Sequence, residues 1–232
     1  MPGTAPLLLL TGSPGCGKTT VAPLVADRHS PSVCLDLDWF FAKLRSGAIE
    51  PWREEAHRQN RVVLTAAAEA VAAFAQGGYF TVAEGILYPF MLDLFVDACA
   101  PHGISPDYAV LRAPISVVQQ RVQDRKLELP HAGALADAAV VDDLWSQFER
   151  HGVEERHRVD SGDRPPEEVA AEIDRRMDFS IALVGLSLVV GTVGVAKLPK
   201  GETRTIAAIL VTLAWIFALG LGELVSIGAA IG

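Results

Sequence analysis

The chain has 232 residues, half of them hydrophobic, and a formal net charge of −8. At roughly 100–200 residues per domain, this length allows one full domain and a smaller addition, which excludes a large multidomain machine. The negative charge and the lack of a basic run argue against binding to a nucleic-acid backbone. The three cysteines, Cys16, Cys34 and Cys99, form no C-x-x-C pair, so neither a disulfide framework nor a zinc site is indicated.

Residues 1–177 alternate between strand and helix patterns, which predicts an α/β domain with a parallel sheet between two layers of helices. The five predicted strands are 7–11, 32–38, 79–83, 107–111 and 156–160. The predicted helices are 18–28, 53–76, 90–100, 115–126, 137–150 and 166–176. The apolar run at 7–10 is too short for the core of a signal peptide, so we expect a cytoplasmic domain.

Two acids close the second predicted strand. Side chains alternate along a strand, so Asp36 and Asp38 are predicted to share one face. At about 3.3 Å per residue, they would lie about 6.6 Å apart along the strand.

Residues 12–19 match the pattern G-x-x-x-x-G-K-[ST] between a predicted strand and a predicted helix, the context that makes this P-loop specific. Its glycines let successive N–H groups face one point, where the helix N-terminus adds positive charge. Lys18 would reach the outer phosphates of ATP, and the Thr19 hydroxyl would ligate Mg²⁺. The predicted ATP-binding residues are Gly12, Ser13, Pro14, Gly15, Cys16, Gly17, Lys18, Thr19 and Thr20.

The third predicted strand is followed by a single acid, Glu84, then Gly85. A motor or remodelling ATPase usually carries two adjacent acids at this point, to hold Mg²⁺ and polarise water. ATP hydrolysis as the purpose of the protein is therefore disfavoured. The paired acids of this chain, Asp36 and Asp38, lie at the end of the second strand instead.

Over residues 5–175 the sequence resembles the small P-loop kinases, namely the shikimate and gluconate kinase type, chloramphenicol phosphotransferase and the zeta-toxin-like kinases. Besides the P-loop, the resemblance rests on Asp36-Leu37-Asp38, Glu84-Gly85, Leu111-Arg112, Arg121 with Arg125, and the segments Val159-Asp160 and Pro166-Glu167-Glu168-Val169. It implies a kinase that moves the γ-phosphoryl group of Mg-ATP to a hydroxyl group of a small molecule.

The resemblance also implies roles for single residues. Lys18 and Asp38 would be catalytic, with Asp38 acting as base toward the acceptor hydroxyl, and Asp36 would lie near Mg²⁺. Arg121 and Arg125, four residues apart on one helix, would belong to a lid that stabilises the transferring phosphates. Alternatively, Asp38 only caps the next helix, and the arginines pair on the surface with neighbouring acids.

The acceptor is predicted to bind beyond the carboxyl ends of the strands, where such folds bind ligands. The candidate lining residues are Trp39, Phe40, Trp52, His57, Asn60 and Glu84. No basic cluster in the sequence marks an anionic acceptor, so a sugar acid or a shikimate-like compound receives no specific support.

The remaining residues, 178–232, differ in composition from the domain before them. The segments 179–196 and 205–222 each contain 18 residues without a charge, enough to span a membrane. Ala214, Ala218 and Gly222 recur at every fourth position and would allow close helix association.

We therefore predict a two-helix transmembrane hairpin that anchors the domain to the inner face of the cell membrane, although the positive-inside rule gives no support. A buried helical hairpin is the alternative for this tail. For the whole chain, the alternative function is a membrane-tethered ATP-binding or ATPase regulator without kinase activity.

Overall fold

The computed structural model describes residues 3–128 and 137–189, with side chains as far as Asp124 and again from 137 to 177. The chain forms two units, Met1–Ile173 and Asp174–Gly232. The first unit contains the whole sheet and both of the cavities considered below.

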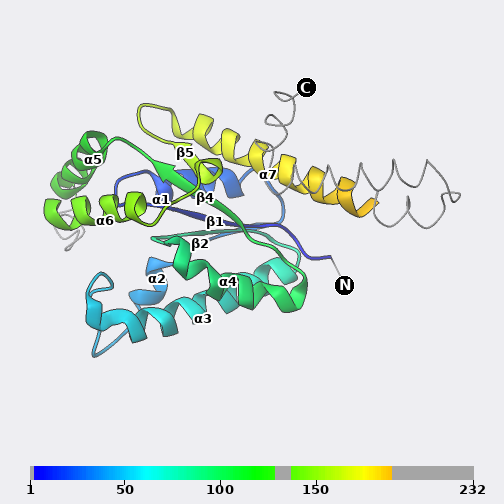
Figure 1. The fold of residues 1–232 in the computed structure, drawn as a ribbon, viewed down its shortest axis with the longest axis horizontal. Coiled ribbons are helices and arrows are strands. Elements are labelled where there is room, and N and C mark those ends of the chain that lie inside the picture. Colours follow the sequence, from blue (N-terminus) through cyan, green and yellow to red (C-terminus); the bar gives the residue numbers. More distant parts are fainter. Residues whose placement is uncertain (1–2, 129–136, 190–232) are drawn as a thin grey trace, which may run out of the picture. The chain divides into compact units, whose positions relative to one another are not determined.

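The five predicted strands all form, and they pair in parallel in the order β2-β3-β1-β4-β5 (Figure 1). Their bounds are β1 Leu7–Gly12, β2 Ser32–Asp36, β3 Phe80–Glu84, β4 Asp107–Arg112 and β5 Arg158–Asp160. The central strand β1 is buried on both faces, which is why it reads as a continuous apolar run rather than an alternating pattern.

Helices cover both faces of the sheet, as predicted. Figure 1 shows α2, α3 and α4 on one side and α1, α5 and α6 on the other. The bounds are α1 Lys18–Ala26, α2 Asp38–Phe41, α3 His57–Gln76, α4 Leu92–Cys99, α5 Ile115–Glu128, α6 Ala138–Arg150 and α7 Pro166–Val189. Short 3₁₀ turns, η1 Glu54–Ala56 and η2 Pro89–Met91, precede α3 and α4.

The alanine-rich helix α3 packs closely on the sheet. Its buried positions Ala67, Ala68, Val71 and Ala75 recur at spacings of one, three and four residues and join Leu9 of β1 in one core cluster. The helix ends at Gln76, before the predicted stop at Gly77-Gly78. The side of the sheet that carries α3 and α4 is thus rigidly packed.

The second strand ends two residues earlier than predicted. The carboxylate oxygen Oδ1 of Asp36 accepts a hydrogen bond of 2.8 Å from the backbone N–H of Asp38, which becomes the first residue of α2. This local side-chain contact turns the chain out of the strand. The prediction that both acids lie on one strand, 6.6 Å apart, is therefore wrong.

The predicted transmembrane hairpin falls mostly outside the described residues, as do Ala214, Ala218 and Gly222. Within the described ranges, no helix is both long enough and apolar enough to cross a membrane. The predicted domain boundary between 177 and 178 lies inside α7.

A buried hydroxyl attaches the segment after β3 to the central strand. Thr11 is fully buried, and its Oγ1 accepts a 2.7 Å hydrogen bond from the N–H of Leu87 and donates to the Leu87 carbonyl at 3.1 Å. The Tyr108 hydroxyl donates to the same carbonyl at 2.9 Å. Thr11 therefore fixes the start of the segment that leads from the sheet edge to α4.

We predict that Thr11→Val lowers the free energy of unfolding by about 1–3 kcal/mol, because it buries the Leu87 N–H without a partner while Tyr108 still serves the carbonyl. Urea denaturation of the purified protein measures this change. The matched control is Thr65→Val, which removes only an exposed bond to the Arg61 carbonyl. Equal losses in the two variants would contradict the assigned role of Thr11.

Candidate active site

The predicted P-loop forms the turn between β1 and α1. Gly12, Gly15 and Gly17 have φ angles of 146°, 77° and 99°, which other residues rarely adopt. A Cβ atom on Gly12 would lie 2.4 Å from the Leu111 carbonyl oxygen, and one on Gly15 would lie 2.8 Å from that of Val118. The loop conformation therefore requires glycine for both torsional and steric reasons.

The ammonium group of Lys18 is held over this loop. Its Nζ donates to the carbonyl oxygens of Gly12 at 3.0 Å and Ser13 at 3.1 Å, and the residue is only 9% exposed. A buried positive charge next to the N-terminus of α1 makes the loop electropositive at its centre. This is the environment that an outer phosphate of a nucleotide requires.

Three carboxylates lie close to Lys18. Asp36 and Glu84 are register partners on the neighbouring strands β2 and β3, and Asp38 follows one residue beyond Leu37. Burial raises the pKa of Asp38; the positive charge of Lys18 opposes this shift, and the negative charge of Asp36 adds to it. Lys18 thus influences carboxylates that come from two strand ends and a helix start.

Glu84 is the most deeply buried of these acids, at 4% exposure. Burial raises its pKa, with further increases from the negative charges of Asp36 and Asp38. The Lys18 charge and a hydrogen bond with the Thr19 side chain act in the opposite direction. Glu84 therefore lies beneath the P-loop, rather than in the acceptor pocket where the sequence analysis placed it.

A metal ion could be held here only with help from other ligands. Among the described residues, no three His, Cys, Asp or Glu side chains form a group that could bind a metal. Mg²⁺ characteristically keeps several waters and binds through one or two protein oxygens and substrate phosphates. The Thr19 hydroxyl and the Asp36 carboxylate are oxygen donors of that kind, so the donor chemistry fits this ion.

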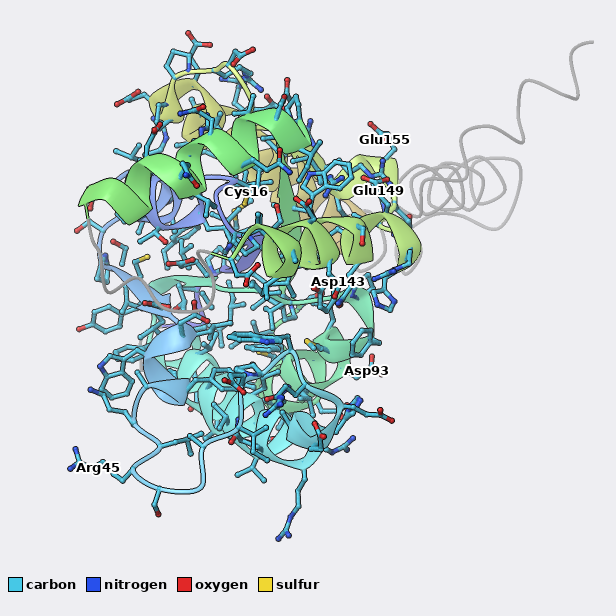
Figure 2. The ribbon with its side chains drawn as sticks, turned by 90° about the vertical axis from the view of Figure 1, so that its left-hand side faces the viewer. Cys16, Arg45, Asp93, Asp143, Glu149 and Glu155 are labelled. Atoms are coloured by element: carbon cyan, nitrogen blue, oxygen red, sulfur yellow. The ribbon has the colours of Figure 1, made fainter. Side chains whose placement is uncertain are left out.

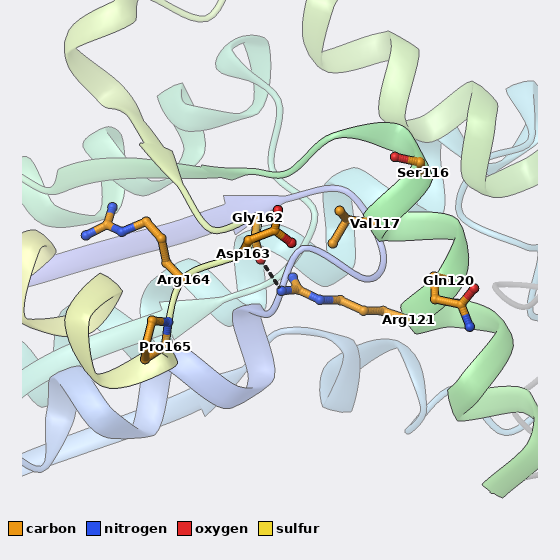
Figure 3. Close-up of a pocket in the computed structure, with 8 residues that line it drawn as sticks. All are labelled: Ser116, Val117, Gln120, Arg121, Gly162, Asp163, Arg164 and Pro165. Atoms are coloured by element: carbon orange, nitrogen blue, oxygen red, sulfur yellow. Dashed lines mark hydrogen bonds between the residues drawn. The ribbon is translucent and has the colours of Figure 1, made fainter.

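Arg121 of α5 extends to the P-loop. Its guanidinium donates to the carbonyl oxygens of Gly15 at 3.4 Å, Ser161 at 3.1 Å and Gly162 (Figure 3). Its predicted surface neighbour Asp124 accepts instead from Gln120 at 2.8 Å. The side chain of Arg125, the second predicted lid arginine, lies outside the described residues.

A cavity of about 520 Å³ opens beside this arginine. Figure 3 shows its residues on α5 and on the segment between β5 and α7; they are Ser116, Val117, Gln120, Arg121, Gly162, Asp163, Arg164 and Pro165. The buried Ser161 at its inner edge donates a 2.8 Å hydrogen bond to the Cys16 carbonyl of the P-loop. The sequence analysis missed this segment, because no motif marks the residues after the last strand.

A larger cavity of about 850 Å³ lies on the other side of the P-loop. Its walls come from α2, the segment before α3, the first turns of α3, the segment from β3 to α4, and α6. They consist of Asp38, Phe41, Pro51, Trp52, Arg53, Glu54, His57, Arg58, Asn60, Arg61, Leu64, Ile86, Tyr88, Phe90, Met91, Asp93, Leu94, Asp97, Leu144 and Gln147. Figure 2 shows two of these elements facing each other, α6 with Asp143 and α4 with Asp93.

The structure places half of the predicted acceptor residues in this cavity. Trp52, His57 and Asn60 line it, whereas Trp39 and Phe40 do not. Trp39 is 54% exposed, with the Lys43 ammonium 4.6 Å from its ring centre, and Phe40 packs against the core. Both aromatic residues follow the unpredicted turn into α2, which redirects their side chains.

The cavity also contains basic residues that the sequence analysis did not group together. Arg53, Arg58 and Arg61 line it with His57. Arg53 pairs with Glu50 at 3.4 Å, whereas Arg58 and Arg61 make no ion pair among the described residues. Their spacing of three residues on one helix was the available signal.

Residues 7–151, more than half of the chain, match the family AAA_33, described as an AAA domain. The chain belongs to this family. The matched region contains the P-loop, both acids of the second strand end, Glu84 and Arg121. Among curated proteins no relative matches significantly.

Solved kinases share the fold. A sugar kinase from Janibacter sp. HTCC2649 is 21% identical, with a TM-score of 0.56, over 77% of this chain and 97% of its own. The APS kinase of Mycobacterium tuberculosis, solved with AMPPNP and APS, is 17% identical, with a TM-score of 0.55 over 76% and 99%. The tunicamycin resistance protein of Deinococcus radiodurans is 17% identical, with a TM-score of 0.54 over 75% and 95%. The predicted resemblance to small P-loop kinases is confirmed as to family and fold.

We predict that Glu84→Gln stabilises the protein at neutral pH but reduces turnover by about tenfold or more. A raised pKa means that the folded protein binds the Glu84 proton more tightly than the unfolded chain, so stability is lost as the pH rises through this pKa. The amide carries no charge to desolvate. The loss of turnover follows because a residue that orients a metal ligand is worth about 10–100-fold.

Thermal unfolding of both proteins measures the first effect. The Tm advantage of Glu84→Gln should be largest near pH 7 and should shrink as the pH falls toward the ordinary pKa range of glutamate. A variant that is less stable than the parent protein at pH 7 would show that the charge of Glu84 is needed for folding.

Proposed function

We propose that the protein transfers the γ-phosphoryl group of Mg-ATP to a hydroxyl group of a small molecule. The observation that carries this proposal is the position of Asp38. Its pKa responds to the charge of Lys18 in the P-loop, and the same residue lines the 850 Å³ cavity. A carboxylate between a phosphate-binding loop and a ligand-sized cavity is suited to receive the proton of an acceptor hydroxyl.

In this mechanism the P-loop amides and Lys18 hold the outer phosphates of ATP. Asp38 orients the acceptor hydroxyl and takes its proton as the oxygen bonds to the γ-phosphorus. Burial raises the pKa of Asp38, which brings this base closer to the working pH. Positioning and neutralisation of charge supply most of the rate in phosphoryl transfer, so Asp38 does not need to be a strong base.

When bound, Mg²⁺ would neutralise charge on the β- and γ-phosphates. Thr19 would hold it through its hydroxyl and Asp36 through its carboxylate. Glu84, hydrogen-bonded with Thr19, would orient that hydroxyl. Arg121 and Arg125 would stabilise the charge of the transferring group.

The 520 Å³ cavity is suited to the adenine base of the nucleotide. It adjoins the P-loop, because Arg121 in its wall is bonded to Gly15 and Gly162. Val117 and Pro165 provide apolar surface, and the guanidinium plane of Arg121 can stack on a flat ring. ATP would thus extend from this cavity across the P-loop toward Asp38.

We predict that Asp38→Asn lowers acceptor-stimulated ADP release by about 10²–10⁴-fold, the usual contribution of a general base, and leaves Mg-ATP binding unchanged. The assay screens hydroxylated metabolites and antibiotics for stimulated ADP release and then compares the variants on the best acceptor. Glu69→Gln, an exposed change in the middle of α3, is the matched control.

Undiminished turnover by Asp38→Asn would contradict the role of this residue. Binding of Mg-ATP without stimulation by any acceptor would favour the alternative, a nucleotide-binding regulator.

For the tail, we propose membrane attachment through 179–196 and 205–222, with the domain on the inner face of the cell membrane and helix association through Ala214, Ala218 and Gly222. The uncharged length of the two segments supports this proposal. We predict that the full chain sediments with membranes and resists extraction by high salt, whereas residues 1–177 remain in the supernatant. Recovery of the full chain in the supernatant of a cell lysate would contradict the proposal.

A further inference from the structure

Two polar atoms in the walls of the larger cavity have no partner. Among the described residues, Asn60 Oδ1 and the Tyr88 hydroxyl are the buried side-chain oxygens without a hydrogen bond. Both residues line the 850 Å³ cavity that Asp38 also lines. Proteins leave few buried polar groups unpaired, because each one costs free energy, so the coincidence of both in one cavity calls for a ligand.

Neither side chain is free to turn away. The Nδ2 group of Asn60 donates to the Pro51 carbonyl at 2.7 Å, which fixes the amide and the direction of its Oδ1. The ring of Tyr88 lies 4.7 Å from that of Phe148, 5.7 Å from that of Phe90 and 5.2 Å from that of His151. The residue is 4% exposed, so its hydroxyl is held in the wall.

Much of the remaining wall is apolar and comes from separate parts of the chain, with Phe41, Trp52, Leu64, Ile86, Phe90 and Leu144. Phe90 is 55% exposed, so its ring offers apolar surface that a ligand can cover. The volume lies near the upper end of the range of about 300–1,000 Å³ found for pockets that bind drug-sized molecules. A monosaccharide would leave much of this cavity, and much of its apolar wall, in contact with water.

We propose that the acceptor is an amphipathic hydroxy compound larger than a monosaccharide. Its apolar body covers Phe90 and Trp52, and its polar groups pair with Asn60 Oδ1 and the Tyr88 hydroxyl. This inference rests on the proposed function, since it assigns the cavity beside Asp38 to the phosphoryl acceptor.

The transfer step balances without another reactant. The acceptor oxygen forms a bond to the γ-phosphorus while the bond from this phosphorus to the β–γ bridging oxygen breaks. The hydroxyl proton passes to Asp38, and ADP leaves with the electron pair of the broken bond.

The first experiment compares paired probes on the full chain. Glucose and gluconate represent polyols; phenyl glucoside, octyl glucoside and chloramphenicol represent hydroxy compounds with an apolar body. Two quantities are measured, ADP release with Mg-ATP and the Tm shift with Mg-AMPPNP. We expect stimulation and a positive Tm shift from members of the amphipathic set only. Stronger responses to glucose or gluconate, or none from the amphipathic set, would overturn the inference.

The second experiment uses Tyr88→Phe, which removes one oxygen and keeps the ring. We expect the KM for the best amphipathic acceptor to rise about three- to tenfold, the effect of one neutral hydrogen bond, with the KM for ATP unchanged. The Tm should not fall, because the variant removes an unpaired buried group. The control Tyr79→Phe alters a 42% exposed tyrosine outside the cavity.

An unchanged acceptor KM in Tyr88→Phe would overturn the role assigned to this hydroxyl. Failure of the proposed function looks different, because it would appear as absent Mg-ATP binding or as insensitivity to Asp38→Asn. A preference for polyols with normal ATP binding would leave the kinase proposal intact and reject only the acceptor class.

Discussion

The candidate site depends on one electrostatic constraint, a buried ammonium group beside three carboxylates at the edge of a parallel sheet. Lys18 is held by loop carbonyls of Gly12 and Ser13, and it opposes the rise in pKa that burial causes at Asp38 and Glu84. Parallel pairing brings the ends of β1, β2 and β3 together, so residues far apart in the sequence share this charge. An arrangement with excess buried negative charge is costly on its own and is suited to bind Mg²⁺ with a nucleotide.

The two cavities extend from this centre in different ways. The smaller one is bounded by α5 and the segment after β5, and Arg121 ties it to the P-loop through backbone carbonyls. The larger one is bounded by helices that are fixed on the sheet, and Thr11 secures the segment that carries Tyr88 and Phe90. Asp38 lies where the larger cavity meets the charged centre, which is the geometry that transfer between two bound molecules requires.

Local patterns in the sequence predicted the sheet and the P-loop well, because both depend on short contiguous runs. The position of Asp38 on α2 was missed, since a single hydrogen bond from its N–H to the Asp36 side chain overrides the strand alternation. Trp39 and Phe40 were misplaced for the same reason. The contact of Glu84 with Thr19 depends on strand register, and the segment after β5 reaches the P-loop only through tertiary packing. Neither is encoded in a local pattern, whereas the shared face of Arg58 and Arg61 is.

Calorimetric titration of the folded full chain with Mg-AMPPNP tests the central claim most directly, namely that the loop around Lys18 binds a nucleoside triphosphate. We predict one binding site per chain, weakened at least about tenfold in Lys18→Ala, since hydrogen bonds to charged groups contribute about 1.5–3 kcal/mol. No detectable heat of binding with the parent protein, or equal affinity in Lys18→Ala, would contradict the claim.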